Sequence, residues 1–136
     1  MSTKPLPHAT VESQPYWDGV AQGCLRLQTC AACHRPRHYP QLACPHCYSL
    51  DCTWIDAAGT GRIHSWTVAH HAFHPAFRDE LPYTLVTIDL DEGPRALGRL
   101  ARVDEGHLAI GSRVRITFPP NEAGTRLPEI SLIRDA

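Results

Sequence analysis

Two pairs of cysteines are the residues in this sequence whose type and spacing best fit a chemical site. Two residues separate Cys30 from Cys33 and Cys44 from Cys47, and ten residues separate the two pairs. Four thiolates on two short turns suit the tetrahedral coordination of Zn²⁺, with Zn–S bonds of about 2.3 Å. The gap between the pairs has room for a short hairpin, so we predict a zinc ribbon that binds one zinc ion per chain.

Two other uses of paired cysteines fit the sequence less well. A redox-active Cys-x-x-Cys stands alone at the start of a helix, whereas this segment repeats the pair and is rich in proline and histidine. A disulfide framework is typical of secreted chains, and this sequence opens without a leader peptide. We therefore expect a reducing, cytoplasmic location. A closed four-sulfur site has no open position for water, so the zinc is expected to be structural.

Length and composition indicate a small globular protein with no bias toward acidic or membrane partners. The chain has 136 residues, of which 43% are apolar, and a net charge of −1. It contains no apolar run long enough to cross a membrane. Of its 13 basic residues, Lys4 is the only lysine. The planar guanidinium group of arginine suits the recognition of phosphate and carboxylate groups.

Residues 1–23 are predicted to form a polar arm and a short helix, ahead of a ribbon domain over residues 24–53. Ser13 is a candidate N-cap, Pro15 fits the first turn and Gly23 fits the C′ position, which places the helix at residues 15–22. Two aromatic residues of this helix are candidates for core packing or, together with Phe77, for binding a partner protein: Tyr16 and Trp17. The two remaining cysteines are expected to be small buried residues: Cys24 and Cys52.

A cationic cluster lies between the two cysteine pairs. Arg35, Arg37 and His38 precede Tyr39 in this segment. Guanidinium and imidazole groups bind phosphate, and an aromatic ring stacks on a base, so these four residues are candidate ligand contacts. The alternative is a solvated hairpin tip without a ligand.

From Trp54 onward the pattern changes to strands, and no helical periodicity follows Gly23. In the first strand His64, Trp66 and Val68 are expected to share one face. Five strands with glycine-rich corners favour a closed OB-fold barrel over residues 54–136. The strands are predicted at residues 62–69, 83–90, 94–101, 112–118 and 125–133. The side chains expected to face the core in the second and fourth of these strands are Val86, Ile88, Leu90, Val114, Ile116 and Phe118.

A long connection, residues 70–82, joins the first two barrel strands and has no predicted internal structure. Phe73 and Arg78 make it a candidate for folding over a ligand or partner, and a merely connecting loop is the alternative. No carboxylate or regular element positions its histidines, which argues against a catalytic role for them: His70, His71 and His74.

In order along the chain, these residues resemble a known family: zinc-ribbon/OB-fold proteins, first described as a domain of unknown function, that accompany thiolase-fold enzymes acting on acyl-CoA. Family members often carry glycine after each cysteine pair, where this chain has His34 and Tyr48. They often carry arginine where this chain has Gln41, so Arg35 or Arg37 would replace that contact. The motifs are Tyr16-Trp17, Leu25-x-Leu27-Gln28-x-Cys30-x-x-Cys33, Tyr39-Pro40, Cys44-Pro45-x-Cys47, Trp54, the segment 59–67, Pro82-Tyr83, the turn 91–93 and the segment 110–118.

The resemblance implies a mainly β fold: a short N-terminal helix, a rubredoxin-like zinc ribbon and a five-stranded OB-fold barrel. It implies a non-catalytic accessory subunit in a hetero-oligomer with a thiolase-superfamily enzyme, either a β-ketoacyl-CoA thiolase, an acyltransferase or a retro-aldolase. The partner would supply the nucleophilic cysteine and catalytic histidines, and the ribbon and barrel would help hold the acyl-CoA. The residues expected to bind CoA are Arg35, Arg37, His38, Tyr39, Phe73 and Arg78.

The competing hypotheses come from other functional classes. Zinc ribbons and OB-folds also bind nucleic acid, but acidic residues outnumber arginines over residues 54–136, which disfavours binding driven by counterion release. A stand-alone hydrolase that uses the histidine loop is the third possibility. The sequence shows no Ser/His/Asp signature and no glycine-rich phosphate loop that would support an enzyme.

Overall fold

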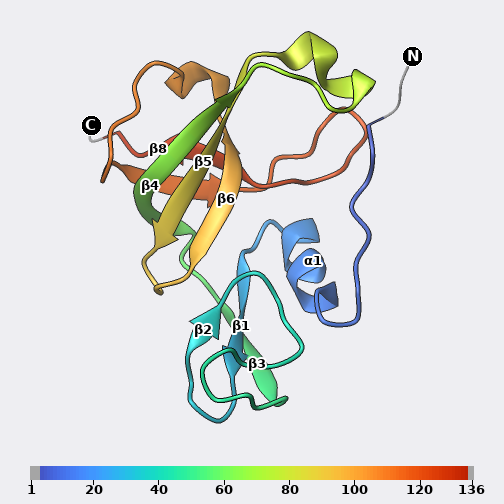
Figure 1. Ribbon diagram of the computed structural model, residues 1–136, viewed down its shortest axis with the longest axis vertical. Coiled ribbons are helices and arrows are strands. Elements are labelled where there is room, and N and C mark those ends of the chain that lie inside the picture. Colours follow the sequence, from blue (N-terminus) through green and yellow to red (C-terminus); the bar gives the residue numbers. More distant parts are fainter. Residues whose placement is uncertain (1–3, 135–136) are drawn as a thin grey trace.

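In the computed structural model, which describes residues 4–134, the chain forms a lower lobe with one helix and three short strands and an upper lobe with a closed barrel (Figure 1). The helix α1 spans Gln14–Ala21. The lower sheet has the order β2-β1-β3, and the barrel has the order β4-β5-β6-β8-β7. The mainly β fold, the ribbon and the five-stranded barrel are as predicted from the sequence. No helix of the described residues is long and apolar enough to span a bilayer.

The helix α1 begins and ends one residue earlier than predicted. Pro15 lies in the first turn of the helix, where a backbone N–H would have no intrahelical acceptor, so the lack of an N–H in proline costs no hydrogen bond. Ser13 occupies the N-cap position but makes no capping bond; its hydroxyl accepts a hydrogen bond from the Thr10 amide at 2.8 Å. Gly23 follows the helix with φ of +75°, and its N–H donates to the Val20 carbonyl at 2.9 Å.

The ribbon sheet is built on β1 (Arg26–Cys30), which pairs antiparallel with β2 (Pro36–Arg37) and with β3 (Cys52–Asp56). The central strand is buried over most of its length, whereas β3 is largely exposed. The prediction that Cys24 and Cys52 are buried is therefore wrong: the first is half-buried and the second is exposed. Cys52 begins a strand on the outside of the sheet, where Gln28 Nε2 donates to its sulfur at 3.5 Å.

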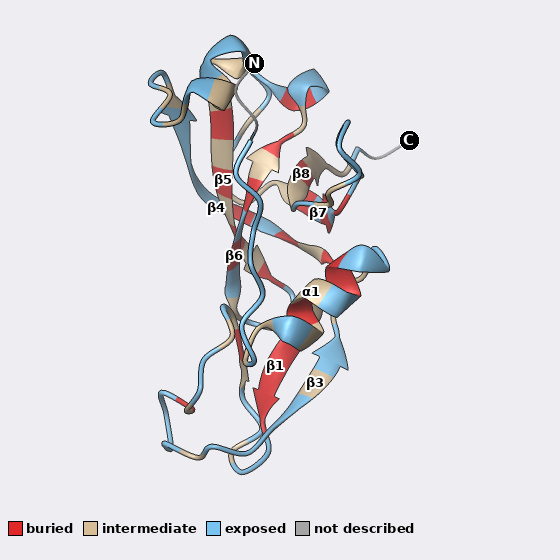
Figure 2. Cartoon of the chain, turned by 90° about the vertical axis from the view of Figure 1, so that its right-hand side faces the viewer, coloured by how far each residue is buried: buried red, intermediate tan, exposed pale blue. Residues whose placement is uncertain are grey.

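Five strands close the barrel. They are β4 (Thr60–Ala69), β5 (Tyr83–Leu90), β6 (Arg95–Leu100), β7 (Arg113–Thr117) and β8 (Glu129–Leu132). The predicted inward residues of β5 and β7, together with Phe118, are buried, because alternation along each strand directs every second side chain to the core (Figure 2). The last strand begins four residues later than predicted, after Pro128.

The barrel closes at a short parallel contact between β6 and β8. Only Arg99 with Glu129 and Leu100 with Ile130 form pairs there. Gly98 makes the approach possible, since a Cβ atom at this position would lie 2.8 Å from Cγ1 of Ile130. The closure thus depends on a residue without a side chain.

The strand β4 departs from the predicted alternation. The register with β5 shifts between Ile63 and Ser65, so His64 is an inserted bulge residue. Trp66 lies opposite Val86 and shares the inward side of the sheet with Ile63, whereas His64 is placed beside Asp89, with Nδ1 3.3 Å from a carboxylate oxygen. The prediction that His64 shares a face with Trp66 is therefore wrong, because one extra residue reverses the alternation.

The connection between β4 and β5 also has structure that the sequence pattern did not predict. Residues Pro75–Glu80 form a 3-10 helix, η1. His74 caps it, with Nδ1 accepting a hydrogen bond from the Ala76 amide at 3.1 Å. A second 3-10 helix, η2, spans Arg102–Asp104. The N-terminal arm reaches η1, where Lys4 forms an ion pair with Glu80 at 2.6 Å.

Candidate functional site

The four predicted zinc ligands come together at the end of the ribbon. The sulfur atoms of Cys30, Cys33, Cys44 and Cys47 all lie within 4.8 Å of one another. Cys30 and Cys47 are 3.5 Å apart, and Cys33 and Cys44 are 3.7 Å apart. A tetrahedral Zn²⁺ with bonds of about 2.3 Å requires sulfur separations of about 3.8 Å. The sulfur positions fit one structural zinc ion.

Backbone geometry directs amides toward these sulfurs. Ala32 and Cys33 donate to Cys30 Sγ, each at 3.4 Å, and His46 donates to Cys44 Sγ at 3.4 Å. The residue after each pair then adopts a left-handed conformation, with φ of 64° at both His34 and Tyr48. For any residue with a side chain this conformation costs free energy that glycine avoids.

The amides change the acidity of the thiols. The Cys33 and Ala32 amides lower the pKa of Cys30 to about 6, and the Cys47 and His46 amides lower the pKa of Cys44. Two opposing effects act on Cys47: the Ser49 amide lowers its pKa, and the neighbouring Cys30 thiol raises it. The net result is a pKa of about 11. Zn²⁺ displaces such protons, since thiolates are its ligands. The amides therefore favour the form of the site that binds metal.

A stack of three rings joins the ribbon to the rest of the molecule. His38 lies between Tyr16 of α1 and Tyr39, with ring centroids 5.3 and 4.0 Å apart. The Tyr39 hydroxyl accepts a hydrogen bond from the Leu97 amide of β6 at 3.2 Å. Burial lowers the pKa of His38 to about 4, so this imidazole is neutral at neutral pH. Burial also raises the pKa of Tyr16 to about 12.

Arg37 is an internal residue and not part of a solvated tip. It is only 6% exposed, and its Nε donates to Gln28 Oε1 at 2.8 Å while Nη2 donates to the Gln41 carbonyl at 3.3 Å. The Gln41 amide donates to the same Gln28 oxygen at 2.8 Å. These bonds fix the segment between the cysteine pairs against β1. The remaining nitrogen, Nη1, is buried and has no hydrogen-bond partner among the described residues.

A cleft of about 380 Å³ opens between the ribbon and the β5–β6 turn, and we call it the waist cleft. Three of the residues predicted to bind CoA line this cleft: Arg35, Arg37 and His38. A fourth, Tyr39, follows His38 directly in the sequence. Glu92 lines the barrel side. One of its oxygens accepts from the Ala58 amide at 2.9 Å, and the other is buried without a hydrogen-bond partner in residues 4–134. His46 also lines the cleft, and the sequence analysis missed it. Its position inside the second cysteine pair was the available signal.

The other two predicted CoA contacts lie elsewhere. Phe73 and Arg78 belong to the connection that carries η1, at the far end of the barrel from the ribbon (Figure 1). Phe73 is 94% exposed and contacts His71 edge-on, with ring centroids 4.6 Å apart. The structure therefore gathers four of the six residues at the waist and leaves two remote from it.

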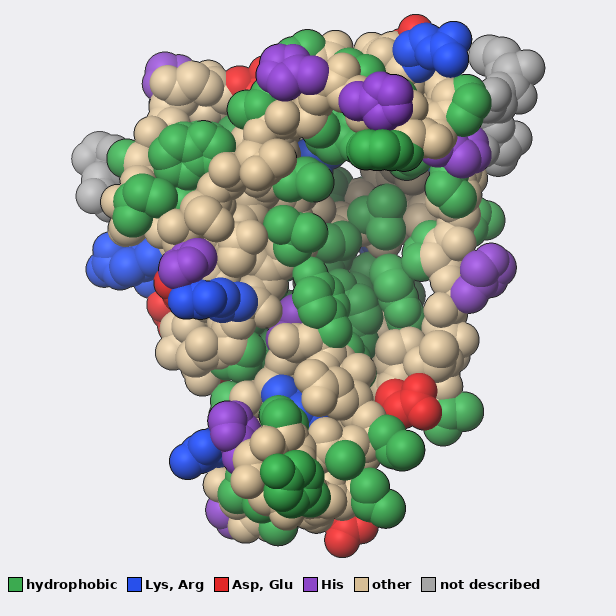
Figure 3. Space-filling view, in the orientation of Figure 1, with side chains coloured by type: hydrophobic (Ala, Val, Ile, Leu, Met, Phe, Trp, Pro, Cys, Tyr) green, Lys and Arg blue, Asp and Glu red, His purple; other side chains and the backbone are tan. Residues whose placement is uncertain are grey.

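The three residues predicted to bind a partner are also separated. Tyr16 is 5% exposed and belongs to the core, so it stabilises the fold and offers no outer surface. Phe77 is half-buried on η1 beneath the Lys4 ammonium group, 5.4 Å from the ring centroid. Trp17 is half-buried and lines a second hollow of about 240 Å³ beside the N-terminal arm (Figure 3). Partner contacts at Trp17 and Phe77 stay predictions.

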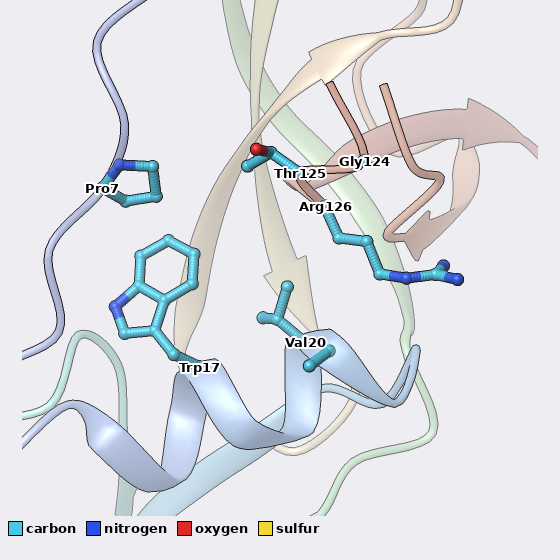
Figure 4. Close-up of a pocket in the computed structure, with 7 residues that line it drawn as sticks. Pro7, Trp17, Val20, Gly124, Thr125 and Arg126 are labelled. Carbon is cyan, nitrogen blue, oxygen red and sulfur yellow. The ribbon is translucent and has the colours of Figure 1, made fainter. Parts of the chain in front are cut away.

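This second hollow lies between α1 and the loop that precedes β8. Pro7 and Trp17 face each other across it, and Val20 projects from the helix below Thr125 and the stem of Arg126 (Figure 4). The Arg126 guanidinium points away from the indole and donates to the Phe118 carbonyl at 2.8 Å. The hollow is therefore mainly apolar.

Two family models match consecutive parts of the chain. Residues 17–51 match "ChsH2, rubredoxin-like zinc ribbon domain", and residues 54–119 match "ChsH2, C-terminal OB-fold domain". A chain of the solved Ltp2-ChsH2(DUF35) aldolase superposes with a TM-score of 0.82 at 35% identity, over 93% of this chain and 98% of that chain. The chain belongs to the DUF35 family.

DUF35 relatives carry two kinds of description. A protein from Thermomonospora curvata described as a probable enoyl-CoA hydratase alpha subunit is 36% identical over 92% of this chain and 39% of its own length. This chain thus spans about two fifths of that relative. A DUF35 domain-containing scaffold protein from Methanothermobacter thermautotrophicus is 28% identical over 65% of this chain and 67% of its own length.

Proposed function

We propose that this chain is a non-catalytic accessory subunit of an acyl-CoA enzyme, which binds a thiolase-fold partner and helps hold the CoA portion of the substrate in the waist cleft. The likeness to almost the whole of one chain of the Ltp2-ChsH2(DUF35) aldolase carries this proposal. The names of the hydratase subunit and the scaffold relative support an accessory role in an acyl-CoA pathway.

The ribbon side of the waist cleft has the chemistry that a CoA phosphate requires, whereas the Glu92 carboxylate lies on the barrel side. Arg35 is exposed on its rim, and its guanidinium has no hydrogen bond or ion pair with any other residue of the described chain. His46 lies on the same rim, and Arg37 is fixed behind them by Gln28 and Gln41. A charge-assisted hydrogen bond to a phosphate is worth about 1.5–3 kcal/mol. Arg35 is therefore the residue expected to contribute most to CoA binding.

The division of labour leaves the bond-making chemistry to the partner. Within residues 4–134 the four cysteines form the only cluster of potential metal ligands, and a closed four-sulfur zinc site offers no position for substrate. The chain supplies a rigid surface instead, because the ring stack and the Tyr39 hydroxyl hold the ribbon against the barrel.

Affinity purification tests the accessory role. The tagged chain, expressed in its native host, is expected to retain a thiolase-fold protein that mass spectrometry identifies, and the purified pair is expected to act on an acyl-CoA. Turnover of a thioester at an enzyme-like rate by the isolated chain would contradict the proposal. So would the absence of any thiolase-fold protein from the retained fraction.

A charge reversal tests the CoA site. Arg35→Glu is expected to weaken CoA binding by the complex about 10- to 100-fold, since one charge-assisted bond is lost. Arg78→Glu is the matched control, because it makes the same change at the far end of the barrel. Isothermal titration with CoA measures both. Equal affinities for the two variants would place the CoA away from the waist cleft.

A further inference from the structure

The outer half of β4 is a strand edge without a neighbour. β4 pairs with β5 from Gly61 to Ala69, but it pairs with β7 only at Thr60, Gly61 and Arg62. Ile63 still exchanges backbone hydrogen bonds with the segment before β7, donating to the Ser112 carbonyl at 3.0 Å. Beyond it, residues 65–69 have no backbone partner on this side among the residues that the structure describes. We call residues 65–69 the free edge of β4.

The bulge at His64 decides which backbone groups the free edge offers. Ile63 directs its N–H and C=O away from β5, and regular alternation would direct those of residue 65 the same way. Because one residue is inserted, the N–H and C=O of Trp66 and Val68 take that direction instead. Each of these two residues therefore presents a donor and an acceptor to an incoming strand.

Two large apolar side chains of the free edge are partly open to solvent. Trp66 is 38% exposed and Val68 is 44% exposed. Figure 2 shows the outer half of β4 in the colour of exposed residues. A long apolar edge with unpaired backbone groups pairs readily with other chains unless it is covered. The edge therefore has the features of a strand-addition site.

The charges around the free edge favour an acidic partner over a basic one. From Arg62 to Arg78 the sequence has four histidines and no aspartate or glutamate. On the neighbouring strand and turn, Asp89 and Asp91 each form an ion pair with an arginine. Carboxylates on an incoming strand would accept hydrogen bonds from the imidazole and guanidinium groups of this segment and would meet no carboxylate between Arg62 and Arg78.

We propose that an extended, carboxylate-bearing segment of the partner subunit adds a strand to the free edge of β4. Backbone bonds to Trp66 and Val68 supply the register, and apolar side chains of the segment cover Trp66 and Val68. This docking mode rests on the proposed function in one respect, namely that the partner subunit supplies the segment. The competing occupants are a second copy of this chain, paired edge to edge, and a basic segment.

Two synthetic peptides of strand length test the edge in the full chain. One alternates valine with glutamate and the other alternates valine with lysine. The glutamate peptide is expected to slow amide hydrogen exchange at Trp66 and Val68 by about tenfold or more, and to leave Thr67, which already points to β5, unchanged. Binding of the lysine peptide is expected to be at least about tenfold weaker.

A pair of variants at one position separates backbone pairing from side-chain contact. Val68→Pro removes the outward N–H while leaving the ladder with β5 intact, since proline is tolerated on the open side of an edge strand. It is expected to weaken binding of the glutamate peptide about tenfold. Val68→Ala keeps the N–H and is expected to weaken binding only a few-fold. Zinc content and exchange of β5 amides show whether each variant is folded.

Several results would overturn the proposal. These are equal binding of the two peptides, equal affinity of the two Val68 variants, and protection of Trp66 and Val68 that appears without peptide and increases with protein concentration. The last result would identify a second copy as the occupant. If Val68→Pro does not fold, the comparison of the two peptides on the unaltered chain decides the matter.

The failure of this proposal and the failure of the proposed function look different. A Val68→Pro chain that still co-purifies with the thiolase-fold partner at the level of Val68→Ala rejects strand addition and leaves the accessory role intact. Peptide binding at the free edge by a chain that retains no thiolase-fold partner rejects the accessory role and leaves the edge as a docking site for another protein.

Discussion

The ribbon and the barrel are stabilised by different means. Between Cys30 and Asp51 the only fully buried apolar side chains are those of Cys30 and Cys44, and both are metal ligands. The barrel has a continuous core from Ile63 to Ile130, which Val20 of α1 and Leu27 of β1 extend. A region of about 20 residues cannot bury enough apolar surface to offset its conformational entropy, so the metal supplies the missing stability.

This difference determines which amino-acid substitutions each region tolerates. The ribbon depends on four sulfur atoms and on the buried strand β1, and many side chains between its two cysteine pairs are exposed, which leaves that surface available for ligand contacts such as Arg35. The barrel depends on close packing among many buried side chains, so its stability is spread over many contacts. Variants that remove one means of stabilisation at a time separate the two regions.

Removal of a zinc ligand is expected to have the largest effect. Cys44→Ser should abolish zinc binding and unfold the ribbon, because structural zinc contributes on the order of 10 kcal/mol in comparable sites. Amide exchange should become fast in β1 and stay slow in β5. Cys52→Ser is the matched control, since this thiol is exposed and outside the cluster, and it should retain zinc. One zinc per chain in Cys44→Ser, measured by native mass spectrometry, would contradict the ligand assignment.

A cavity in the barrel core is expected to rank second. Ile88 is fully buried, so Ile88→Ala should lower the free energy of unfolding by about 2–5 kcal/mol while zinc content stays at one per chain. Ile55→Ala provides the comparison in the ribbon sheet, where the side chain is 37% exposed and the loss should be below about 1 kcal/mol. Chemical denaturation measures both. A larger loss for Ile55→Ala would mean that the ribbon also depends on apolar packing.

Acid is expected to weaken the junction between the two regions. In the unfolded chain His38 gains a proton below about pH 6.5, whereas in the folded chain it gains one only near pH 4. The contribution of His38 to the stability of the folded state is therefore fully present above pH 6.5 and is lost progressively as the pH falls toward 4. The loss is on the order of 2 kcal/mol.

The variant His38→Phe keeps a ring in the stack and removes this titration. Its free energy of unfolding should therefore fall less between pH 7 and pH 5 than that of the unaltered chain. Loss of zinc in acid affects both proteins alike and cancels in the comparison. Equal pH dependences would show that His38 does not control the junction.

The smallest expected effect concerns the Tyr39 hydroxyl. Tyr39→Phe removes the hydrogen bond to the Leu97 amide, which is worth about 0.5–1.5 kcal/mol. Exchange of the Leu97 amide should accelerate while zinc content and the barrel core are unchanged. Tyr48→Phe is the control, because this ring is 80% exposed on the ribbon. An unchanged exchange rate at Leu97 would mean that another contact holds the regions together.

Local signals predicted most of the fold. The spacing of the four cysteines predicted the metal ligands, because a chelating turn is a short-range structure. Alternation predicted the inward side of β5 and β7, since strand period is a property of the backbone. The bulge at His64 escaped this reasoning, because it depends on the partner strand as well as on the sequence of β4.

The candidate site was harder to predict, since it depends on contacts between distant segments. Arg37 reads as a solvated charge, yet Gln28 lies close enough to hold it inside the ribbon. Arg78 resembles Arg35 in type and exposure, but the fold places it at the other end of the molecule. The cap of η1 by His74, which directly precedes a proline, was a local signal that could have been recognised.

The parallel contact between β6 and β8 has a consequence for how the molecule comes apart. Two residue pairs hold this join, whereas β5 is held on both sides along most of its length. Thermal motion should therefore separate the barrel here before it disturbs any other pair of barrel strands, and among the hydrogen-bonded amides of the barrel those of Arg99 and Ala101 should exchange first. A larger residue in place of Gly98 would hold the wall open at this position, and zinc bound by the ribbon cysteines would not restore the missing strand pairs.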